Sequence, residues 1–306
     1  MIKNIAKPFV KWVGGKTQLL NQIDNLIPSN IKLSNDTVYI EPFVGGGAVL
    51  FFILQKYTNV MKAYINDINK DLMDTYRVIK ENPQQLICSL KNMEKEYNLL
   101  SVNNKKDYYL TQRERFNAKN DDYILNSALF IFLNKTCFNG LYRVNSQGNF
   151  NTPHGKYEKP LICNEDNIII CHKLLEKVEI LQGDFENTLL YANEHTFYYL
   201  DPPYKPISVT SAFTSYSKEN FDDEDQMRLN KFCNNITERG ASFILSNSDL
   251  NTEENKNTFF DDLYSNYFIY RVKANRMINS NAKRRGKIFE LMISNKEQTN
   301  HLYHGK

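Results

Sequence analysis

The 306-residue sequence has little that would mark a membrane protein or a metalloprotein. No run of about 18 apolar residues occurs, so we expect no membrane span, and residues 1–7 lack the apolar core of a signal peptide. The five cysteines are an odd number without a C-x-x-C pair, and the five histidines show no metal-ligand spacing. The sequence therefore predicts a cytoplasmic protein with reduced thiols, without a metal ion and without a membrane partner.

A strong charge of one sign is also missing. The net charge of +3 and the isoelectric point near 8.4 are too mild to indicate a polyanionic partner, so local clusters must supply that evidence. The hydrophobic content of 42% is ordinary for a globular protein, and the length suits one large domain or one domain with an insert.

The most informative stretch is F-Y-Y-L-D-P-P-Y at 197–204. Its aromatic and apolar start predicts a buried strand, and its two prolines end the ladder. Because ligands of open α/β sheets bind beyond the carboxyl ends of strands, Asp201 and Tyr204 are expected in a crevice. A carboxylate, the free Pro202 carbonyl and an aromatic face together suit a planar ring with an exocyclic amine. An ordinary Asp-Pro turn remains the alternative for D-P-P alone.

A second signal is a strand at 37–41 that enters a glycine-rich turn. Gly45 and Gly47 allow the backbone to pass close to a ligand, although Leu50 breaks the pattern G-x-G-x-x-G. The next expected strand ends in Asp67, at the place where an acid holds ribose hydroxyls in nucleoside-binding units. This pattern favours an adenosine-type ligand; the alternative is a tight turn with an acidic helix cap.

Near the amino terminus, Gly15-Lys16-Thr17 is similar to the tail of a phosphate-binding loop. Val10 stands where that loop needs glycine, which argues against a nucleotide-hydrolysing P-loop. What remains is a Gly-Gly turn that holds Lys16 beside Trp12, followed by an amphipathic helix expected at 17–27.

The middle of the chain has a different character. Residues 70–133 have helical periodicity, whereas 134–153 predict a β-hairpin with turns at Asn139-Gly140 and Gln147-Gly148. Arginine and asparagine side chains on a hairpin suit base edges in a major groove, although a polar surface loop is the alternative. Further strands are expected at 178–185, 242–247, 267–272 and 287–293. The last two flank the basic residues Lys273, Arg276, Lys283, Arg284 and Arg285, which indicate phosphate contacts or a charged sheet edge.

Taken together, the motifs resemble the Dam-type, alpha-class (D12) DNA adenine-N6 methyltransferases. The resemblance runs along nearly the full chain, in the order F-V-K-W-V-G-G-K, E-P-F-V-G-G-G, N-D-I-N, F-N-G-L-Y-R-V-N, G-N-F-N-T-P-H-G-K-Y, G-D-F, D-P-P-Y and A-K-R-R-G-K. One departure is His154, where related sequences carry Phe.

The resemblance implies an α/β fold, a Rossmann-like S-adenosylmethionine-dependent methyltransferase sheet with an inserted helical and β-hairpin DNA-recognition domain. It implies a catalytic domain of residues 1–69 and 163–306 and a target-recognition domain of residues 70–162. It also implies methylation of N6 of a flipped adenine in double-stranded DNA, with G-A-T-C as the expected site. A companion restriction endonuclease acting on the same site is a further expected partner.

Site residues follow from the same resemblance. The catalytic residues are Asp201, Pro202 and Tyr204. S-adenosylmethionine would be bound by Trp12, Lys16, Glu41, Phe43, Gly45, Gly47, Asp67, Asp184, Phe185 and Asp201. DNA would be bound by Lys11, Phe138, Asn139, Leu141, Arg143, Asn151, Pro153, Arg276, Lys283 and Arg284, with Phe138 as a wedge in the base stack. A cytosine-N4 methyltransferase, an RNA amine methyltransferase and a DNA-binding protein without catalysis are the competing interpretations.

Overall fold

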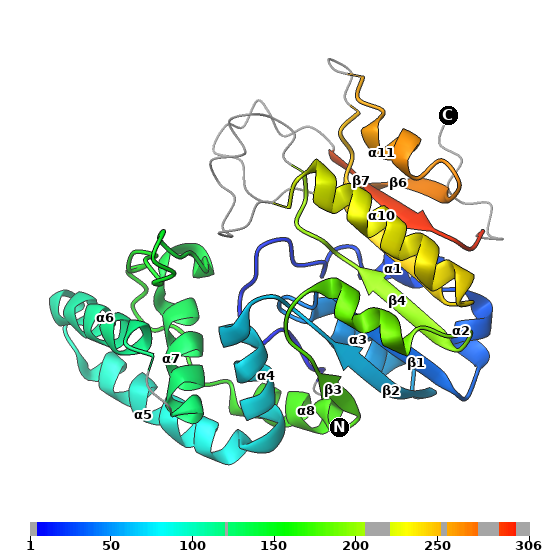
Figure 1. Ribbon diagram of the computed structural model, residues 1–306. Helices are drawn as coiled ribbons and strands as arrows, with labels where there is room; N and C mark the ends of the chain where they lie inside the picture. Colours follow the sequence, from blue (N-terminus) through cyan, green and yellow to red (C-terminus); the bar gives the residue numbers. More distant parts are fainter. Residues whose placement is uncertain (1–4, 120–121, 206–220, 252–255, 275–287, 298–306) are drawn as a thin grey trace.

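The protein is described from a computed structural model, which covers residues 5–119, 122–205, 221–251, 256–274 and 288–297 (Figure 1). Its strands are β1 (Thr37–Glu41), β2 (Val60–Ile65), β3 (Val178–Ile180), β4 (Thr196–Leu200), β5 (Ser242–Ser248), β6 (Phe268–Ala274) and β7 (Ile288–Ser294). Its α-helices are α1 (Leu20–Leu26), α2 (Ser29–Leu33), α3 (Ala48–Lys56), α4 (Lys70–Glu81), α5 (Pro83–Leu99), α6 (Val102–Asn117), α7 (Tyr123–Thr136), α8 (Glu165–Leu175), α10 (Asp223–Glu238) and α11 (Phe259–Leu263). Two 3₁₀ helices are η1 (Phe138–Gly140) and η2 (Phe185–Tyr191).

The seven described strands form one sheet in the order β3-β2-β1-β4-β5-β7-β6. The first five run parallel, and β7 is antiparallel to both of its neighbours. The strand order reverses between β1 and β4, which is where open parallel sheets bind their ligands. This sheet confirms the expected Rossmann-like methyltransferase fold.

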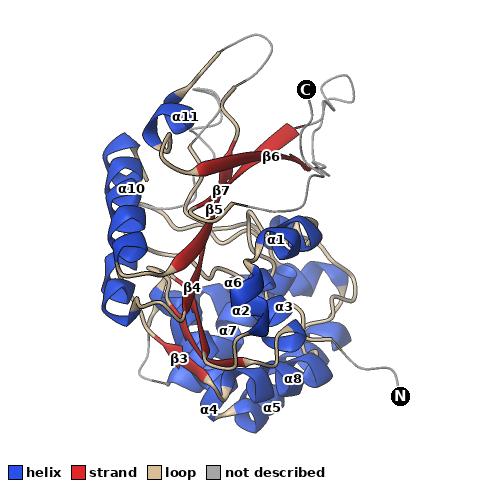
Figure 2. Ribbon diagram, turned by 90° about the vertical axis from the view of Figure 1, so that its right-hand side faces the viewer, coloured by secondary structure: helices blue, strands red, loops and turns tan. Residues whose placement is uncertain are grey.

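Both faces of the sheet are buried, as the strand sequences require. Side chains alternate along β4, so that Phe197 and Tyr199 join one hydrophobic cluster while Tyr198 and Leu200 join another. Helices α1, α3 and α8 cover the first face, and α10 covers the second (Figure 2). This two-sided burial explains why β4 is an unbroken aromatic and apolar run.

The predicted helical segment at 70–133 is confirmed as α4 to α7. Helix α4 contacts α7 on one side and α8 and β3 on the other, while α5, α6 and α7 form a separate group beside the sheet (Figure 1). One hydrophobic cluster runs through this group and into the sheet. The division into domains at 70–162 stays a prediction.

Three expected elements differ from the sequence prediction. The helix expected at 17–27 covers only Leu20–Leu26. The stretch 178–185 forms a strand only up to Ile180, because Asp184 caps η2 through a hydrogen bond from the Glu186 N–H. The expected hairpin is a loop closed by two isolated antiparallel bridges, Cys137 with His154 and Val144 with Phe150. A continuous ladder is absent from this described loop, because η1 turns the backbone between the bridges.

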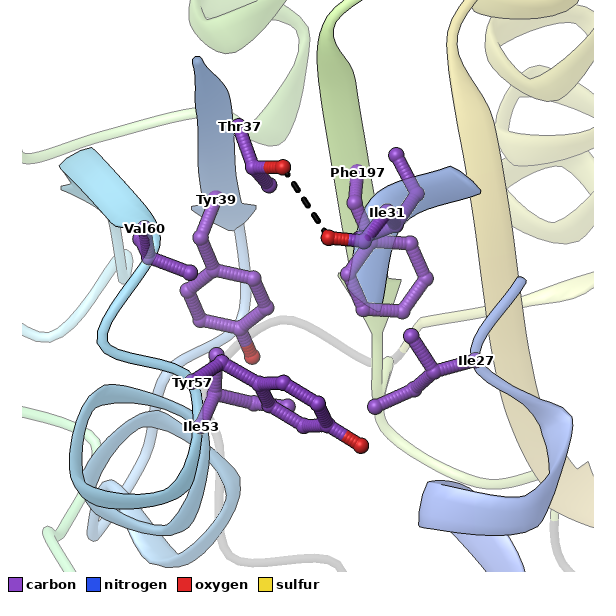
Figure 3. Close-up of a pocket in the computed structure, with 8 residues that line it drawn as sticks. All are labelled: Ile27, Ile31, Thr37, Tyr39, Ile53, Tyr57, Val60 and Phe197. Atoms are coloured by element: carbon purple, nitrogen blue, oxygen red, sulfur yellow. Dashed lines mark hydrogen bonds between the residues drawn. The ribbon is translucent and has the colours of Figure 1, made fainter. Parts of the chain in front are cut away.

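A small apolar cavity of about 10 Å³ lies between α1, α3 and the amino-terminal ends of β1 and β2 (Figure 3). Its wall includes Tyr39, Tyr57 and Phe197, and the Thr37 hydroxyl donates a hydrogen bond of 3.1 Å to the Ile31 carbonyl beside it. The cavity is no larger than a single water molecule and lies at the edge opposite to the strand switch. It is a packing defect of the core.

None of the described helices is long and apolar enough to cross a membrane.

Candidate active site

The candidate active site lies where the strand order reverses. The carboxyl end of β1 leads into the glycine turn 42–47, and the carboxyl end of β4 leads directly into Asp201. Since β1 and β4 pair in parallel, with Ile40 opposite Tyr198, their ends meet at one edge of the sheet. The two strongest motifs of the sequence are thereby brought together, as expected.

Asp201 holds an ion pair that the sequence did not predict. The Lys16 ammonium lies 2.8 Å from Asp201 Oδ1, donates a hydrogen bond of 2.7 Å to the Gly14 carbonyl, and sits 4.5 Å from the centroid of the Tyr204 ring. Lys16 is 4% exposed, so the Gly-Gly turn delivers a buried cation to the D-P-P-Y motif. A cation between a carboxylate and an aromatic face is bound by both.

Two further hydroxyl groups, those of Ser246 and Tyr199, form a chain of hydrogen bonds that ends on Asp201. The buried Ser246 hydroxyl, on β5, donates to Asp201 Oδ1 at 3.1 Å, and the Tyr199 hydroxyl lies 2.9 Å from Ser246 Oγ. Burial raises the pKa of the Asp201 carboxyl, while Lys16 and Ser246 act in the opposite direction. The sequence did not single out Ser246 or Tyr199 as site residues, because a serine or tyrosine inside a strand gives no local sign of a hydrogen bond to the site.

We expect this balance to be visible in the pH dependence of catalysis. The methyl-transfer rate should fall on the acid side at a pH above 3.8, the ordinary aspartate pKa, because burial favours the protonated Asp201 carboxyl. In a Lys16→Met variant the ammonium that lowers this pKa is gone, so the acid limb should move to higher pH. The value of kcat/KM for the DNA duplex, which reports the groups of the free enzyme, is measured across pH to test this. An acid limb that stays in place in the variant would contradict the role of Lys16.

The glycine turn is tied to the end of β2 by Asp67. Asp67 Oδ2 accepts a hydrogen bond of 3.0 Å from the Gly45 N–H, and Oδ1 accepts one of 2.9 Å from the Asn69 N–H. Each carboxylate oxygen can accept a second bond, so Asp67 keeps capacity for a ribose hydroxyl. Burial raises its pKa, and the two N–H donors oppose that shift.

Glu41 ends β1 almost fully buried, at 2% exposure. Its Oε2 accepts a hydrogen bond of 2.7 Å from the Tyr39 hydroxyl. Burial raises its pKa well above the ordinary value, and the negative charges of Asp201 and Asp67 add to this effect. Three carboxylates thus gather around the switch point. The two that are less buried, Asp67 and Asp201, can offer acceptor oxygens to the expected S-adenosylmethionine.

Trp12 joins the amino-terminal loop to the glycine turn and to the helical region. A Cβ on Gly45 would lie 2.7 Å from Trp12 Cδ1, so the indole packs directly on the turn. Its ring also stacks on Tyr142 at a centroid distance of 5.8 Å. Trp12 therefore touches both the expected cofactor pocket and the loop 137–155, where most of the recognition residues are predicted.

The remaining predicted cofactor residues form an aromatic wall. The rings of Phe43 and Phe185 lie 5.3 Å apart between centroids. Arg228 of α10 lies over Phe185 at 4.6 Å and forms an ion pair of 2.9 Å with Asp184. The Asp184 carboxylate therefore already has two partners, the Glu186 N–H at the start of η2 and the Arg228 guanidinium. Arg228 was not predicted from the sequence.

The predicted recognition residues gather in the loop 137–155. The Asn134 side chain anchors it, because it accepts from the Lys11 N–H and donates to the Lys11 and Gly140 carbonyls at 2.8 to 2.9 Å. The Phe138 N–H donates to the Pro153 carbonyl at 2.8 Å, while the Phe138 side chain is 52% exposed. An exposed phenylalanine on a fixed loop suits the expected wedge.

Within the same loop, Arg143 is held by Asn151. Arg143 Nε donates to Asn151 Oδ1 at 2.7 Å, and its terminal nitrogen donates to the Asn151 carbonyl at 3.1 Å. The Leu141 carbonyl accepts from the Thr152 hydroxyl at 2.8 Å, and Asn139 has a positive φ of 55°. Arg276, Lys283 and Arg284, predicted to bind DNA, lie outside the described residues.

His154, the departure from the family pattern, is integrated into the helical region. Its Nε2 lies 2.7 Å from the Tyr97 hydroxyl, and its ring packs on Tyr109. Burial lowers the pKa of His154, and the positive charges of Lys105, Lys106 and Lys156 lower it further. A neutral imidazole here packs among aromatic rings and forms one hydrogen bond with Tyr97.

Comparisons with protein families and with known proteins give matches over most of the chain. The model of the family described as D12 class N6 adenine-specific DNA methyltransferase matches residues 12–278. The chain is 49% identical over 293 residues to the Type II methyltransferase M.MjaIII of Methanocaldococcus jannaschii, covering 95% of this chain and 99% of that protein. It is 37% identical to the Type II methyltransferase M1.LlaDCHI of Lactococcus lactis, with 94% and 95% covered. It is 33% identical to the DNA adenine methylase of Vibrio cholerae, with 94% and 95% covered.

Proposed function

We propose a target sequence and a catalytic route for this chain, which belongs to the D12 class of N6 adenine-specific DNA methyltransferases and uses S-adenosylmethionine as methyl donor. The family decides against a cytosine-N4 enzyme, an RNA methyltransferase and a non-catalytic binding protein. The proposed reaction is methylation of N6 of an adenine that is flipped out of duplex DNA within G-A-T-C. The observation that carries it is the position of Asp201 and Tyr204 around a buried cation at the strand switch.

The chemistry follows from the weakness of the nucleophile. The N6 lone pair is delocalised into the purine ring, and the atom is out of reach inside a duplex, so the base must leave the stack at a cost of about a few kcal/mol. Tyr204 stacks on the flipped ring. Asp201 and the Pro202 carbonyl accept the two N6 hydrogens, which localises the lone pair on nitrogen.

The glycine turn, Asp67 and Trp12 would hold S-adenosylmethionine, which when bound would supply an electrophilic methyl group. Its carbon–sulfur bond would break as N6 bonds to the methyl carbon, and one N6 proton, hydrogen-bonded to Asp201, would then be released. The chain aligns N6 with that methyl group and stabilises the positive charge that develops on nitrogen. The Lys16 ammonium already shows that a cation is stable between Asp201 and the Tyr204 ring. In this proposal the Asp201 carboxylate is the group that stabilises the positive charge developing on N6.

Sequence recognition is assigned to the loop 137–155 and to Lys11. The pairing of F-N-G-L-Y-R with F-N-T-P resembles enzymes that methylate G-A-T-C. In this proposal Lys11, Leu141, Arg143 and Pro153 contact base edges, and Phe138 fills the space that the flipped adenine leaves. Burial, and to a smaller extent the charge of Lys11, lower the pKa of nearby Lys135 to about 8.

A companion restriction endonuclease is a further proposed partner. Two of the relatives carry the name Type II methyltransferase, which supports a protective role against cleavage of the same site. The Vibrio cholerae relative carries the name DNA adenine methylase, which fits a solitary enzyme equally well. Cleavage of the host DNA after removal of this gene, by an activity blocked at methylated sites, would support the partnership.

The reaction and the site are tested together by methyl transfer from labelled S-adenosylmethionine. Three duplexes serve as substrates: one with G-A-T-C, one with that adenine already N6-methylated on both strands, and one with the site scrambled. Label in N6-methyladenine with the intact site alone supports the proposal. Equal label in the scrambled duplex would refute G-A-T-C and leave the reaction in place.

Arg143→Ala should relax the choice of one base pair by about 1–3 kcal/mol, because a bidentate arginine–guanine contact is lost. The ratio of kcat/KM for G-A-T-C and for duplexes with one outer base pair replaced measures the effect. Asn151→Ala, which removes the side-chain acceptor of Arg143 Nε, should weaken the same preference by less. A uniform loss across all duplexes would mean that Arg143 contacts phosphate only.

A further inference from the structure

We propose that Glu290 on β7 is a positioning residue for methyl transfer, which holds the Tyr204 ring in the plane that stacks on the flipped adenine. The inference rests on the stacking role proposed for Tyr204 and assigns a new residue to it. The Tyr204 hydroxyl donates a hydrogen bond of 2.8 Å to Glu290 Oε2, across 86 residues of sequence.

The two partners differ in how firmly their backbones are held. Glu290 lies inside a ladder on both sides, since β7 pairs it with Ser248 of β5 and with Val272 of β6. Tyr204 follows two prolines beyond the end of β4 and has no strand of its own. The hydrogen bond therefore fixes the ring of a loop residue to the rigid centre of the antiparallel half of the sheet.

Tyr204 has contacts of two kinds, at its ring face and at its hydroxyl, and these have different fates in the reaction. Besides Glu290, the hydroxyl also interacts with Asp201 and Ser246. The Lys16 ammonium lies over the ring, 4.5 Å from its centroid, on the face that we assign to the stacked base. A base on that face displaces this cation contact, whereas the hydroxyl at the ring edge stays bound to Glu290. The tyrosine–carboxylate bond is thus the contact that persists when the adenine enters. Because its acceptor is a carboxylate, it is stronger than a neutral hydrogen bond.

Orientation of this ring matters for the transfer step itself. Aromatic rings stack with parallel, offset planes, so a rotated tyrosine side chain would carry the adenine with it or lose contact. N6 must lie in line with the methyl group, and small misplacements of reacting atoms reduce rates strongly. Glu290 would therefore act on the transfer rate more than on the affinity for either substrate.

The experiment is a double-mutant cycle with Glu290→Ala and Tyr204→Phe, read by single-turnover rates at saturating S-adenosylmethionine and G-A-T-C duplex. Each single change should lower the rate about 10-fold, with the Kd for S-adenosylmethionine within about twofold of the parent. The double variant should be no slower than the slower single variant, since both changes remove the same bond. Glu290→Gln keeps an acceptor oxygen and should recover part of the rate.

A spectroscopic readout separates positioning from a general structural effect. With 2-aminopurine at the target position, stacking on Tyr204 quenches the flipped base, so Glu290→Ala should give brighter fluorescence than the parent enzyme. Asp261→Asn is the matched control, because Asp261 pairs with Arg271 on β6 without touching Tyr204. It should leave both rate and fluorescence unchanged.

Two results would overturn the inference. One is a parental rate in Glu290→Ala, and the other is a double variant in which the two losses multiply, because then Glu290 does not act through Tyr204. A parental rate in Tyr204→Ala would instead refute the stacking role of Tyr204 in the proposed function. Glu290→Gln and Tyr204→Phe keep the test decisive if Glu290→Ala does not fold.

Discussion

Asp201→Ala is expected to lower the single-turnover rate of methyl transfer by at least about a thousandfold, since the group that accepts the N6 hydrogens and faces the developing charge is removed. DNA binding should persist, because Arg143 and Phe138 lie on the separate loop 137–155. The rate is measured with labelled S-adenosylmethionine, and binding with the same duplex by fluorescence anisotropy. Turnover near the parental rate would show that Asp201 is not the amine acceptor.

The same change is expected to affect stability through Lys16. This lysine is 4% exposed, so loss of its carboxylate partner leaves a buried ammonium with the Gly14 carbonyl as its remaining acceptor. Breaking a buried pair costs about 3–5 kcal/mol in fully buried cases, and less here because the Asp201 side chain is 19% exposed. Adding Lys16→Met to Asp201→Ala should restore stability without restoring catalysis. Urea unfolding of the parent protein, Asp201→Ala and the double variant measures the stability, and the rate of methyl transfer measures catalysis.

Gly47→Ala should reduce the free energy of unfolding by about 2–4 kcal/mol and weaken S-adenosylmethionine binding. Gly47 has a φ of 76°, and an added Cβ would lie 2.4 Å from the Tyr76 hydroxyl and 3.0 Å from the Phe51 ring. Both neighbours are buried, and the Tyr76 hydroxyl is bound to the Gly45 carbonyl, so neither can move freely. The turn that leads into α3 must shift.

Gly148→Ala is the matched control for this second prediction. Gly148 has a similar φ of 81° but lies exposed on the loop 137–155, and no atom of the described residues lies within 4 Å of an added Cβ. It should lose only about 1 kcal/mol, the cost of the left-handed conformation. Thermal and urea unfolding compare the two variants. Equal losses would mean that backbone strain alone, without the clash against Tyr76, sets the effect at Gly47.

Much of the site could be predicted because its chemistry is concentrated in short motifs. The turn at Gly45, the acid at Asp67 and the sequence around Asp201 each follow a strand, so their meeting at the switch point depends only on the parallel order of the strands. The residues that support them were beyond prediction. Ser246 and Arg228 reach the site from β5 and α10, and a hydroxyl or guanidinium in those elements has no local signature.

The loop 137–155 could not be predicted correctly from its own short motifs. Turn residues at 139–140 and 147–148 indicated a hairpin, and two backbone hydrogen bonds, from the Phe138 N–H to Pro153 and from the Asn151 N–H to Arg143, cross the loop between the isolated bridges. Other carbonyl groups of this loop accept hydrogen bonds from side chains instead. The Asn134 side-chain amide donates to the Gly140 carbonyl, and the Thr152 hydroxyl donates to the Leu141 carbonyl. Such contacts depend on where Lys11 and α7 lie, so local sequence rules could not show that the ladder is interrupted.

Trp12 has a thermodynamic consequence for the enzyme. One indole rests on the glycine turn and also stacks on Tyr142, whose hydroxyl binds Asp71 of α4. If contact of DNA with this loop moves the indole, the expected cofactor pocket changes with it, and a movement on cofactor binding in turn moves the loop. Linkage then requires that each ligand alter the affinity of the other by the same factor.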